Sequence, residues 1–298
     1  MNVLRQLDYT RGQLPELIDV IIEEKTRLFV SAVGVPPPEV IEKLHKAGIL
    51  IMNVSSSLLL DSLLRPGGGA LTNRHGAMSR YSSQMIGHPK HVKKALDVGV
   101  DLICAQAGEG GGHTGDISAS ILLPAVVDAV KGRTSPLTGQ PIWVVGAGAV
   151  YDGRGLAANL AYGAQAVWVG TRFVASDEAG ATRAHKAAVL SADHGDIVRT
   201  LIYTGRPLRV RRTPYVDDWE QNRQAEIREL TGKGIIPNHH EMEKHPEKSV
   251  QAVTFMMGNV AALIEDVLPA QAIVDNMVNE AARVLQDRSK LVSVRTKL

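Results

Sequence analysis

A histidine within a glycine-rich segment is the residue of this chain best suited to chemistry. The segment Gln106 to Asp116 reads Gln-Ala-Gly-Glu-Gly-Gly-Gly-His-Thr-Gly-Asp, so His113 stands among residues with almost no side chains. Imidazole titrates near neutral pH and can accept or donate a proton. Glycines permit positive φ and let the backbone approach a flat or phosphorylated ligand closely. The alternative is a flexible connection that carries a solvated histidine.

A second segment of small residues, Gly146-Ala147-Gly148-Ala149, follows an apolar run. Asp152 is placed to cap a helix that starts near Gly153, and backbone N–H groups at such a helix start can hold a phosphate. The segment is not a dinucleotide fingerprint, because the third glycine of that motif would fall on Tyr151.

A third segment, Gly170-Thr171, follows the next apolar run and adds a hydroxyl. A glycine after a strand is by itself most often a turn. Two consecutive strand ends of this kind, however, are what barrel enzymes use after their last two strands to bind a phosphate. Together with the loop of His113, they predict a phosphorylated cofactor.

Two further groups of polar residues carry weaker signals. His239-His240-Glu241 lacks the helical spacing of a zinc motif, so we interpret it as a solvated turn and expect no metal site. A local run of arginines is interpreted either as solvated surface or as the border of an anionic ligand; it consists of Arg206, Arg209, Arg211 and Arg212.

The elements that must position these residues alternate between short apolar runs and helical patterns, which predicts a parallel sheet with crossover helices. The expected strands are 28–33, 49–53, 101–105, 142–145 and 166–169. The expected helices between them are 38–46, 90–98, 117–131 and 153–162. Beyond Gly170 the pattern predicts only helices, at 178–191, 219–231, 249–266 and 269–286.

The fold class that follows is α/β, either an open parallel sheet or an incomplete (β/α)8 barrel, since about five clear strands are fewer than a closed barrel needs. The expected domains are a partial barrel over residues 1–176 and a mainly helical segment over 177–298 that packs on it. Residues 54–84 are rich in Ser, Gly and Arg without sustained periodicity, and they are interpreted as a disordered insertion.

Composition excludes several classes of protein. No long apolar run suggests a membrane span, and 33 basic against 31 acidic residues, spread along the chain, leave no basic face for nucleic acid. The single cysteine, Cys104, lies inside an expected buried strand, so a disulfide framework is excluded and a reducing compartment is indicated. We find no secretory signal, and the expected location is the cytosol.

The motifs match one known family: the chain resembles a nitronate monooxygenase, formerly called 2-nitropropane dioxygenase, of the fungal or microbial kind. The resemblance covers roughly residues 8–53 and 85–290. It rests on four segments: Gln106 to Asp116, Gly146 to Gly155, Gly163 to Phe173 and Tyr203 to Val210.

The resemblance implies a TIM-barrel flavoprotein that holds FMN noncovalently and oxidises alkyl nitronates with O2 to carbonyl compounds and nitrite. It makes His113 the active-site residue, which accepts the proton next to the nitro group of a nitroalkane or orients the nitronate by hydrogen bonding. It also implies contacts with the flavin or its phosphate for seven residues: Gln106, Gly112, Gly146, Ala147, Gly148, Gly170 and Thr171.

The chain departs from the family pattern in three places. The family pattern opens with a strand that carries a Gln/Ala-Pro-Met-like segment, followed by a Gly-rich turn and further strands, and much of this opening is absent here. The strands that are missing account for the difference between the five clear strands and the eight of a closed barrel. Removing residues 54–84 restores the family's passage from strand to helix, so we hypothesise a retained intron there. Bacterial relatives carry a lysine near His88, which puts a cofactor contact at that position in doubt.

The sequence leaves two other functions open. One is an FMN-dependent enoyl reductase of related barrel type, and the other is a catalytically inactive truncated homologue. The expected partners are a small nitronate and O2, with neither nucleic acid nor membrane, and the sequence leaves the oligomeric state open.

Overall fold

The computed structural model describes residues 12–31, 36–53 and 87–291. The predicted insertion at 54–84 and the end of the first predicted strand lie outside these residues. The chain forms two compact units, which are described separately. Unit 1 comprises residues up to Gly108 together with Thr114–Val145, and unit 2 comprises Glu109–His113 together with Gly146–Leu298. The boundary predicted at residue 176 falls inside unit 2.

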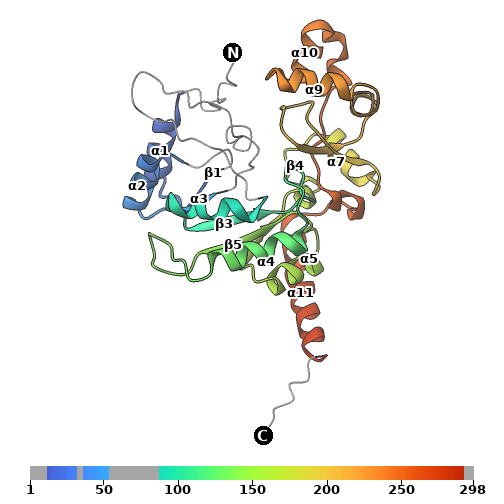
Figure 1. The fold of residues 1–298 in the computed structure, drawn as a ribbon. Coiled ribbons are helices and arrows are strands. Elements are labelled where there is room, and N and C mark those ends of the chain that lie inside the picture. The colour runs from blue at the N-terminus through green and yellow to red at the C-terminus, as the bar shows by residue number, and fades with distance from the viewer. Residues whose placement is uncertain (1–11, 32–35, 54–86, 292–298) are drawn as a thin grey trace, which may run out of the picture. The chain divides into compact units, whose positions relative to one another are not determined.

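The fold is α/β, with a curled sheet of five parallel strands, as the apolar runs predicted (Figure 1). The strand order is β1-β2-β3-β5-β6. In unit 1 the register pairs Leu28 with Leu50 and Met52 with Leu102. The elements of unit 1 are α1 (Leu14–Glu23), β1 (Leu28–Ser31), α2 (Pro38–Lys46), β2 (Leu50–Asn53), η1 (Pro89–His91), α3 (Val92–Asp97), β3 (Leu102–Gln106), α4 (Ala119–Val130) and most of β5 (Trp143–Ala147).

A buried carboxylate ties the elements of unit 1 together at the start of β3. Asp101 accepts from the backbone N–H of Ile51 at 2.8 Å and from the hydroxyl of Ser135 at 2.6 Å. Nε2 of His45 on α2 lies 2.9 Å from the carboxylate, and the N–H of Leu137 donates to it at 3.4 Å. A carboxylate this deeply buried is tolerated only when it is hydrogen bonded, so Asp101 joins α2, β2 and the segment before β5.

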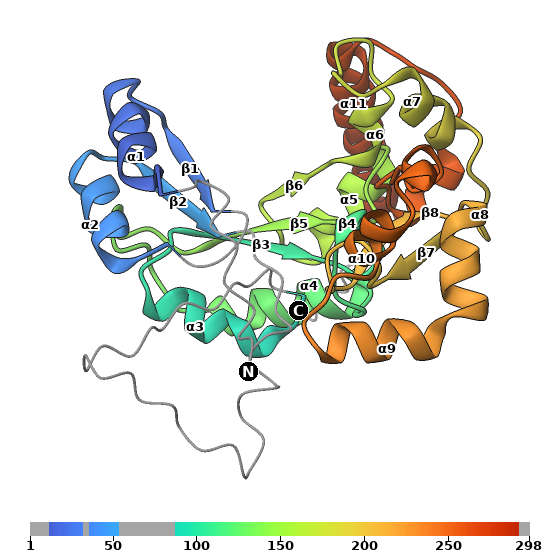
Figure 2. The same ribbon diagram turned by 90° about the horizontal axis from the view of Figure 1, so that it is seen from above.

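Unit 2 contains helices and a small antiparallel sheet of order β4-β8-β7 (Figure 2). Its elements are β4 (Gly112–His113), α5 (Gly153–Ala161), β6 (Ala166–Trp168), α6 (Thr171–Val174), α7 (Arg183–Leu190), β7 (Ile197–Thr200), β8 (Leu208–Arg211), α8 (Pro214–Asp217), the π-helix η2 (Asp218–Asn222), α9 (Gln224–Gly232), α10 (Pro237–Lys244), the 3-10 helices η3 (Pro246–Val250) and η4 (Asn259–Leu263), and α11 (Ala270–Ser289).

Helices α5 and α11 pack so closely that a glycine is required between them. A Cβ on Gly153 would lie 2.5 Å from the backbone nitrogen of Ala281 and 2.6 Å from the carbonyl oxygen of Met277. The N–H of Gly153 donates to the carboxylate of Glu280 on α11 at 2.7 Å. The first turn of α5 is therefore held against α11 by both shape and hydrogen bonding.

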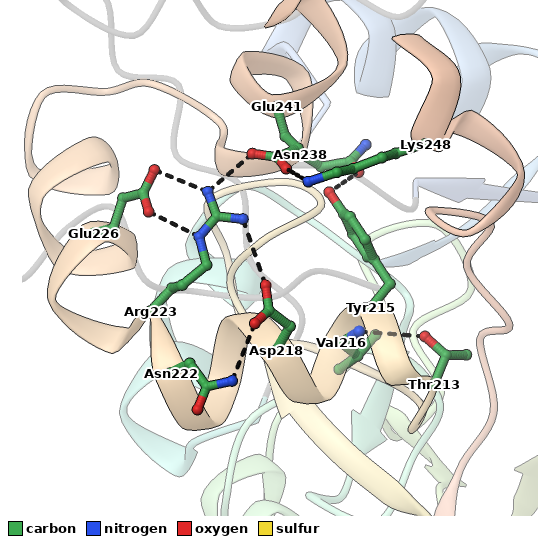
Figure 3. A network of polar contacts seen from close by, with 10 residues as sticks. All are labelled: Thr213, Tyr215, Val216, Asp218, Asn222, Arg223, Glu226, Asn238, Glu241 and Lys248. Atoms are coloured by element: carbon green, nitrogen blue, oxygen red, sulfur yellow. Dashed lines mark hydrogen bonds and ion pairs between the residues drawn. The ribbon is translucent and has the colours of Figure 1, made fainter. Parts of the chain in front are cut away.

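The helices that follow β8 are joined by polar contacts centred on the side chain of Arg223 (Figure 3). Its guanidinium donates to Glu226 of α9 and, at 2.9 Å, to Glu241 of α10. Lys248 donates to the second oxygen of Glu241, and the pKa of Glu241 is lowered to about 2, first by the hydrogen bond from Arg223. The guanidinium also lies over the ring of Trp219, 3.5 Å from its centroid.

The second half of the chain contains the main corrections to the predicted elements. The helix predicted over 249–266 is wrong, because only η3 and η4 are helical there and irregular backbone lies between them. Two strands, β7 and β8, occur between the helices predicted at 178–191 and 219–231, where no element was predicted. The turn predicted at His239-His240-Glu241 is also wrong, since these residues belong to α10 and Glu241 is buried.

Candidate active site

The loop that carries His113 is closed at its base inside unit 1. The N–H of Gly108 donates to the carbonyl oxygen of Ile117 at 2.7 Å, and the hydroxyl of Thr114 donates to the carbonyl oxygen of Ala107 at 2.8 Å. A Cβ on Gly108 would lie 2.8 Å from the carbonyl carbon of Asp116, so this close approach requires glycine. The chain on either side of the loop is therefore held together.

The intervening residues of the loop belong to unit 2, where they contact the segment before η4. A Cβ on Gly111 would lie 2.6 Å from the backbone nitrogen of Gly258, and a Cβ on Gly258 would lie 2.6 Å from the carbonyl oxygen of Glu109. The N–H of Asn259 donates to that carbonyl at 2.9 Å. Two glycines facing each other thus let two backbone segments touch, which fixes the loop just before His113.

His113 is placed by the short strand β4. Its neighbour Gly112 has φ of 71° and pairs with Arg209 of β8, while His113 itself pairs with Leu208. Nε2 of His113 lies 2.9 Å from the hydroxyl oxygen of Thr204. The imidazole is therefore attached to unit 2 both by its backbone and by its side chain.

The environment of His113 favours the neutral imidazole. Burial of the ring lowers the pKa of His113 below its usual 6.5, and the positive charge of Arg206 lowers it further. The neutral form is the one that accepts a proton. At neutral pH the side chain is therefore a base that carries no charge before it reacts.

Thr171 is connected to the same loop. Its hydroxyl oxygen accepts from the N–H of Gly258 at 2.9 Å, and Gly258 in turn contacts the loop of His113. Accepting this bond leaves the hydroxyl hydrogen of Thr171 to donate elsewhere. Gly170, just before it, has no atom within 4 Å of the position of a Cβ, so the backbone there faces open space.

The residues at the end of β5 form a tight turn. Gly146 and Ala147 are the last residues of the strand and are buried, and φ is positive at both Gly148 (80°) and Ala149 (57°). Left-handed backbone of this kind suits glycine and lets the chain pass close to a ligand.

The helix start after this turn is already occupied by carboxylates. Asp152 caps α5, as predicted, by accepting from the N–H of Gly155 at 2.9 Å. Glu280 accepts from the N–H of Gly153. A phosphate therefore fits the strand-end turn at Gly146 to Gly148 and the open backbone at Gly170 better than it fits the first turn of α5.

The last predicted site residue, Gln106, is the final residue of β3 and is partly buried in unit 1. The other seven predicted residues belong to unit 2. Within unit 2 the structure links Gly112, His113 and Thr171 through the segment around Gly258. Among the described residues, we find no group of three or more His, Cys, Asp or Glu side chains arranged for a metal.

Two residues of the arginine run, Arg209 and Arg211, lie in β8, and two of its four side chains form ion pairs. Arg211 pairs with Asp196 at 3.1 Å and Arg212 pairs with Asp217 at 2.7 Å. Both side chains are therefore held by carboxylates of unit 2 and remain partly exposed. Arg206, by contrast, acts on the site through its charge beside His113.

Thr204 and Gly258 were not among the predicted site residues, although Thr204 lies in the segment Tyr203 to Val210 on which the resemblance rests. Thr204 lies 91 positions from His113 in the chain, and Gly258 lies still farther along. A signal existed for Thr204, because it stands directly before Gly205 in this segment, and a hydroxyl beside a turn often bonds the local backbone. The sequence contains no comparable signal for Gly258.

The chain is similar to proteins of known sequence along most of its length. A protein of Mycobacterium tuberculosis named as a monooxygenase is 29% identical over 91% of this chain and 63% of its own length. A second protein of that organism, named (3aS,4S,5R,7aS)-5-hydroxy-7a-methyl-1-oxo-octahydro-1H-indene-4-carboxyl-CoA dehydrogenase, is 32% identical over 70% of this chain and 66% of its own. The chain thus spans slightly less than two thirds of these relatives.

Two solved structures show the same fold. A mutant of FabK from Thermotoga maritima has a TM-score of 0.64 and 25% identity, and the match covers 94% of this chain and 74% of that one. Nitroalkane oxidase from Streptomyces ansochromogenes also has a TM-score of 0.64, with 24% identity, and the match covers 91% of this chain and 68% of that one.

In the described residues, no helix is both long and apolar enough to cross a membrane.

The resemblance drawn from the four motifs is confirmed by a match to one family over residues 72–280, which include the loop of His113 and the strand-end turns after β5 and β6. The chain belongs to the nitronate monooxygenase family, a family of flavin-dependent oxidoreductases.

Proposed function

We propose that this chain oxidises alkyl nitronates with molecular oxygen to carbonyl compounds and nitrite. The reaction balances when two nitronate anions and one O2 give two carbonyl compounds and two nitrite ions. The observation that carries the proposal is the setting of His113 in a chain that matches this family. Its imidazole is partly buried and has a lowered pKa. The residue is held by strand pairing of its backbone and by the contact of its side chain with Thr204.

The cofactor we propose is FMN, which when bound would carry electrons between nitronate and O2. The residues proposed to hold it are Gln106, Gly112, Gly146, Ala147, Gly148, Gly170 and Thr171. The features that fit a phosphate are the positive φ at Gly148, the open backbone at Gly170 and the hydroxyl hydrogen of Thr171.

The chain's own part in the reaction is the handling of a proton. With a neutral nitroalkane, His113 accepts the proton next to the nitro group, and a nitronate anion remains. The resulting imidazolium lies close to that anion and attracts it. With a preformed nitronate no proton needs to be removed, and His113 only orients the substrate.

The test is the visible spectrum of the full chain incubated with FMN, before and after anaerobic addition of an alkyl nitronate. We expect flavin absorption that bleaches on addition and returns with O2, together with nitrite in the solution. Flavin absorption that does not respond to nitronate would contradict the proposal.

The dehydrogenase-named relative and the FabK structure favour a second candidate, a flavin-dependent dehydrogenase or reductase of an acyl thioester. Oxidation of NADH or NADPH in the presence of an enoyl thioester, without nitrite release from nitronates, would establish it instead. A cytosolic location and the absence of a nucleic-acid partner stay predictions from composition.

A further inference from the structure

The hydroxyl of Thr204 lies at the centre of three polar contacts in the turn between β7 and β8. Its oxygen is 2.9 Å from Nε2 of His113, 3.2 Å from the carbonyl oxygen of Arg206 and 3.3 Å from the backbone nitrogen of Arg206. The positive φ at Gly205 forms the turn that places both backbone groups of Arg206 beside the hydroxyl.

Two of these three contacts have a fixed direction. A hydroxyl has one hydrogen to donate and two lone pairs that accept. The N–H of Arg206 can only donate to it, and the carbonyl of Arg206 can only accept from it. The hydroxyl hydrogen is therefore directed to the carbonyl oxygen, and one lone pair is left for Nε2 of His113.

The reverse arrangement carries a cost. If Thr204 donated its hydrogen to Nε2 of His113, two oxygen acceptors would face each other at 3.2 Å, and the carbonyl of Arg206 would lose this hydrogen bond. The first arrangement satisfies all four groups, and it requires a hydrogen on Nε2.

We infer that Thr204 holds the neutral imidazole of His113 as the Nε2–H tautomer, so that Nδ1 is the nitrogen that takes up the substrate proton. The second half of this inference rests on the proposed function. Protonation at Nδ1 leaves the bond from Nε2–H to Thr204 intact, so the ring keeps its orientation through the transfer. Thr204 is thus a positioning residue for the base.

The test is nitrogen NMR of the full chain with 15N-labelled histidines, recorded at a pH well above the pKa of His113, where its imidazole is neutral. A His113→Gln variant identifies the signals of His113. We expect an Nε2 signal typical of a protonated ring nitrogen and an Nδ1 signal typical of an unprotonated one. An Nδ1–H tautomer in the unaltered chain would overturn the inference without any variant being needed.

Two variants separate the hydroxyl from the bulk of its side chain. Thr204→Val removes the hydroxyl and should move the His113 signals toward a mixture of tautomers, whereas Thr204→Ser should restore the pattern. Thr231→Val is the matched control, because its hydroxyl donates to the carbonyl of Ile227 within α9. Signals of His113 that do not change in Thr204→Val would also overturn the inference.

Nitrite release from a neutral nitroalkane tests the catalytic half. We expect kcat about tenfold lower in Thr204→Val, the effect of losing one hydrogen bond, and near normal in Thr204→Ser. Turnover of nitronates by a chain with the Nδ1–H tautomer would overturn the inference and leave the proposed function standing. The Nε2–H tautomer in a chain without nitronate turnover would support the role of Thr204 and overturn the proposed function.

Discussion

Gly111 and Gly258 face each other with no room for a side chain, since a Cβ on Gly111 would lie 2.6 Å from the backbone nitrogen of Gly258. The atom in the way is backbone, which cannot turn aside as a flexible side chain would. The contact lies just before β4, so the position of His113 depends on it.

We therefore expect Gly111→Ala to displace the loop and to reduce nitrite release from nitroalkanes by at least tenfold. Overpacking of this kind costs about 1–3 kcal/mol of unfolding free energy, so the protein should still fold. Gly180→Ala is the control, because nothing lies within 4 Å of a Cβ at that position. Full activity in Gly111→Ala would show that the loop tolerates the displacement.

A second prediction concerns pH. Because burial and then the charge of Arg206 lower the pKa of His113 below 6.5, the neutral base predominates at neutral pH. We expect kcat/KM for a neutral nitroalkane to be constant near pH 7 and to fall as the pH drops through that lowered pKa. His113→Gln should lose this acid limb together with most of the activity.

The same profile tests the influence of Arg206. Arg206→Gln removes the second cause of the lowered pKa, so the acid limb should move toward higher pH while burial still opposes the charged ring. Rate measurements over a pH series with a nitroalkane give the midpoint. A limb that stays in place would mean that the charge of Arg206 does not reach His113.

The sheet was predictable from the sequence because its strands read as short continuous apolar runs, and β3 and β5 are largely buried. β3, for example, has Ile103, Cys104 and Ala105 fully buried, and the predicted run 101–105 overlaps it closely. β7 and β8 were missed because each has only four residues and contains arginine, a pattern too short to separate from a turn.

The site was predictable only in part. The composition around His113 singled out the residue, since a titratable group among glycines has few structural explanations. Thr204 was not predicted, because its contact with His113 depends on pairing between β4 and β8, which are distant in sequence. The helix predicted at 249–266 failed for a related reason: at its centre, Gly258 contacts the loop of His113 through its backbone.

A third prediction concerns the stability of unit 1. Asp101→Ala removes the acceptor of the N–H of Ile51 and the hydroxyl of Ser135, and it leaves both donors buried. We expect the free energy of unfolding to fall by about 3–5 kcal/mol in urea titrations, as when one partner of a buried charged network is lost. Asp97→Ala, which removes an exposed ion pair with Lys93, should change it by less than about 0.5 kcal/mol.

A fourth prediction contrasts two helical glycines of unit 2. Gly153→Ala places a methyl group 2.5 Å from the backbone nitrogen of Ala281, so α5 and α11 must separate. We expect a loss of about 1–3 kcal/mol or more in unfolding free energy. Gly232→Ala, at the end of α9, meets nothing within 4 Å and should instead stabilise the protein by about 0.5–1 kcal/mol. The two variants make the same chemical change in a helix, so only the packing against α11 distinguishes them. Equal effects in thermal unfolding would show that this packing does not limit the stability of unit 2.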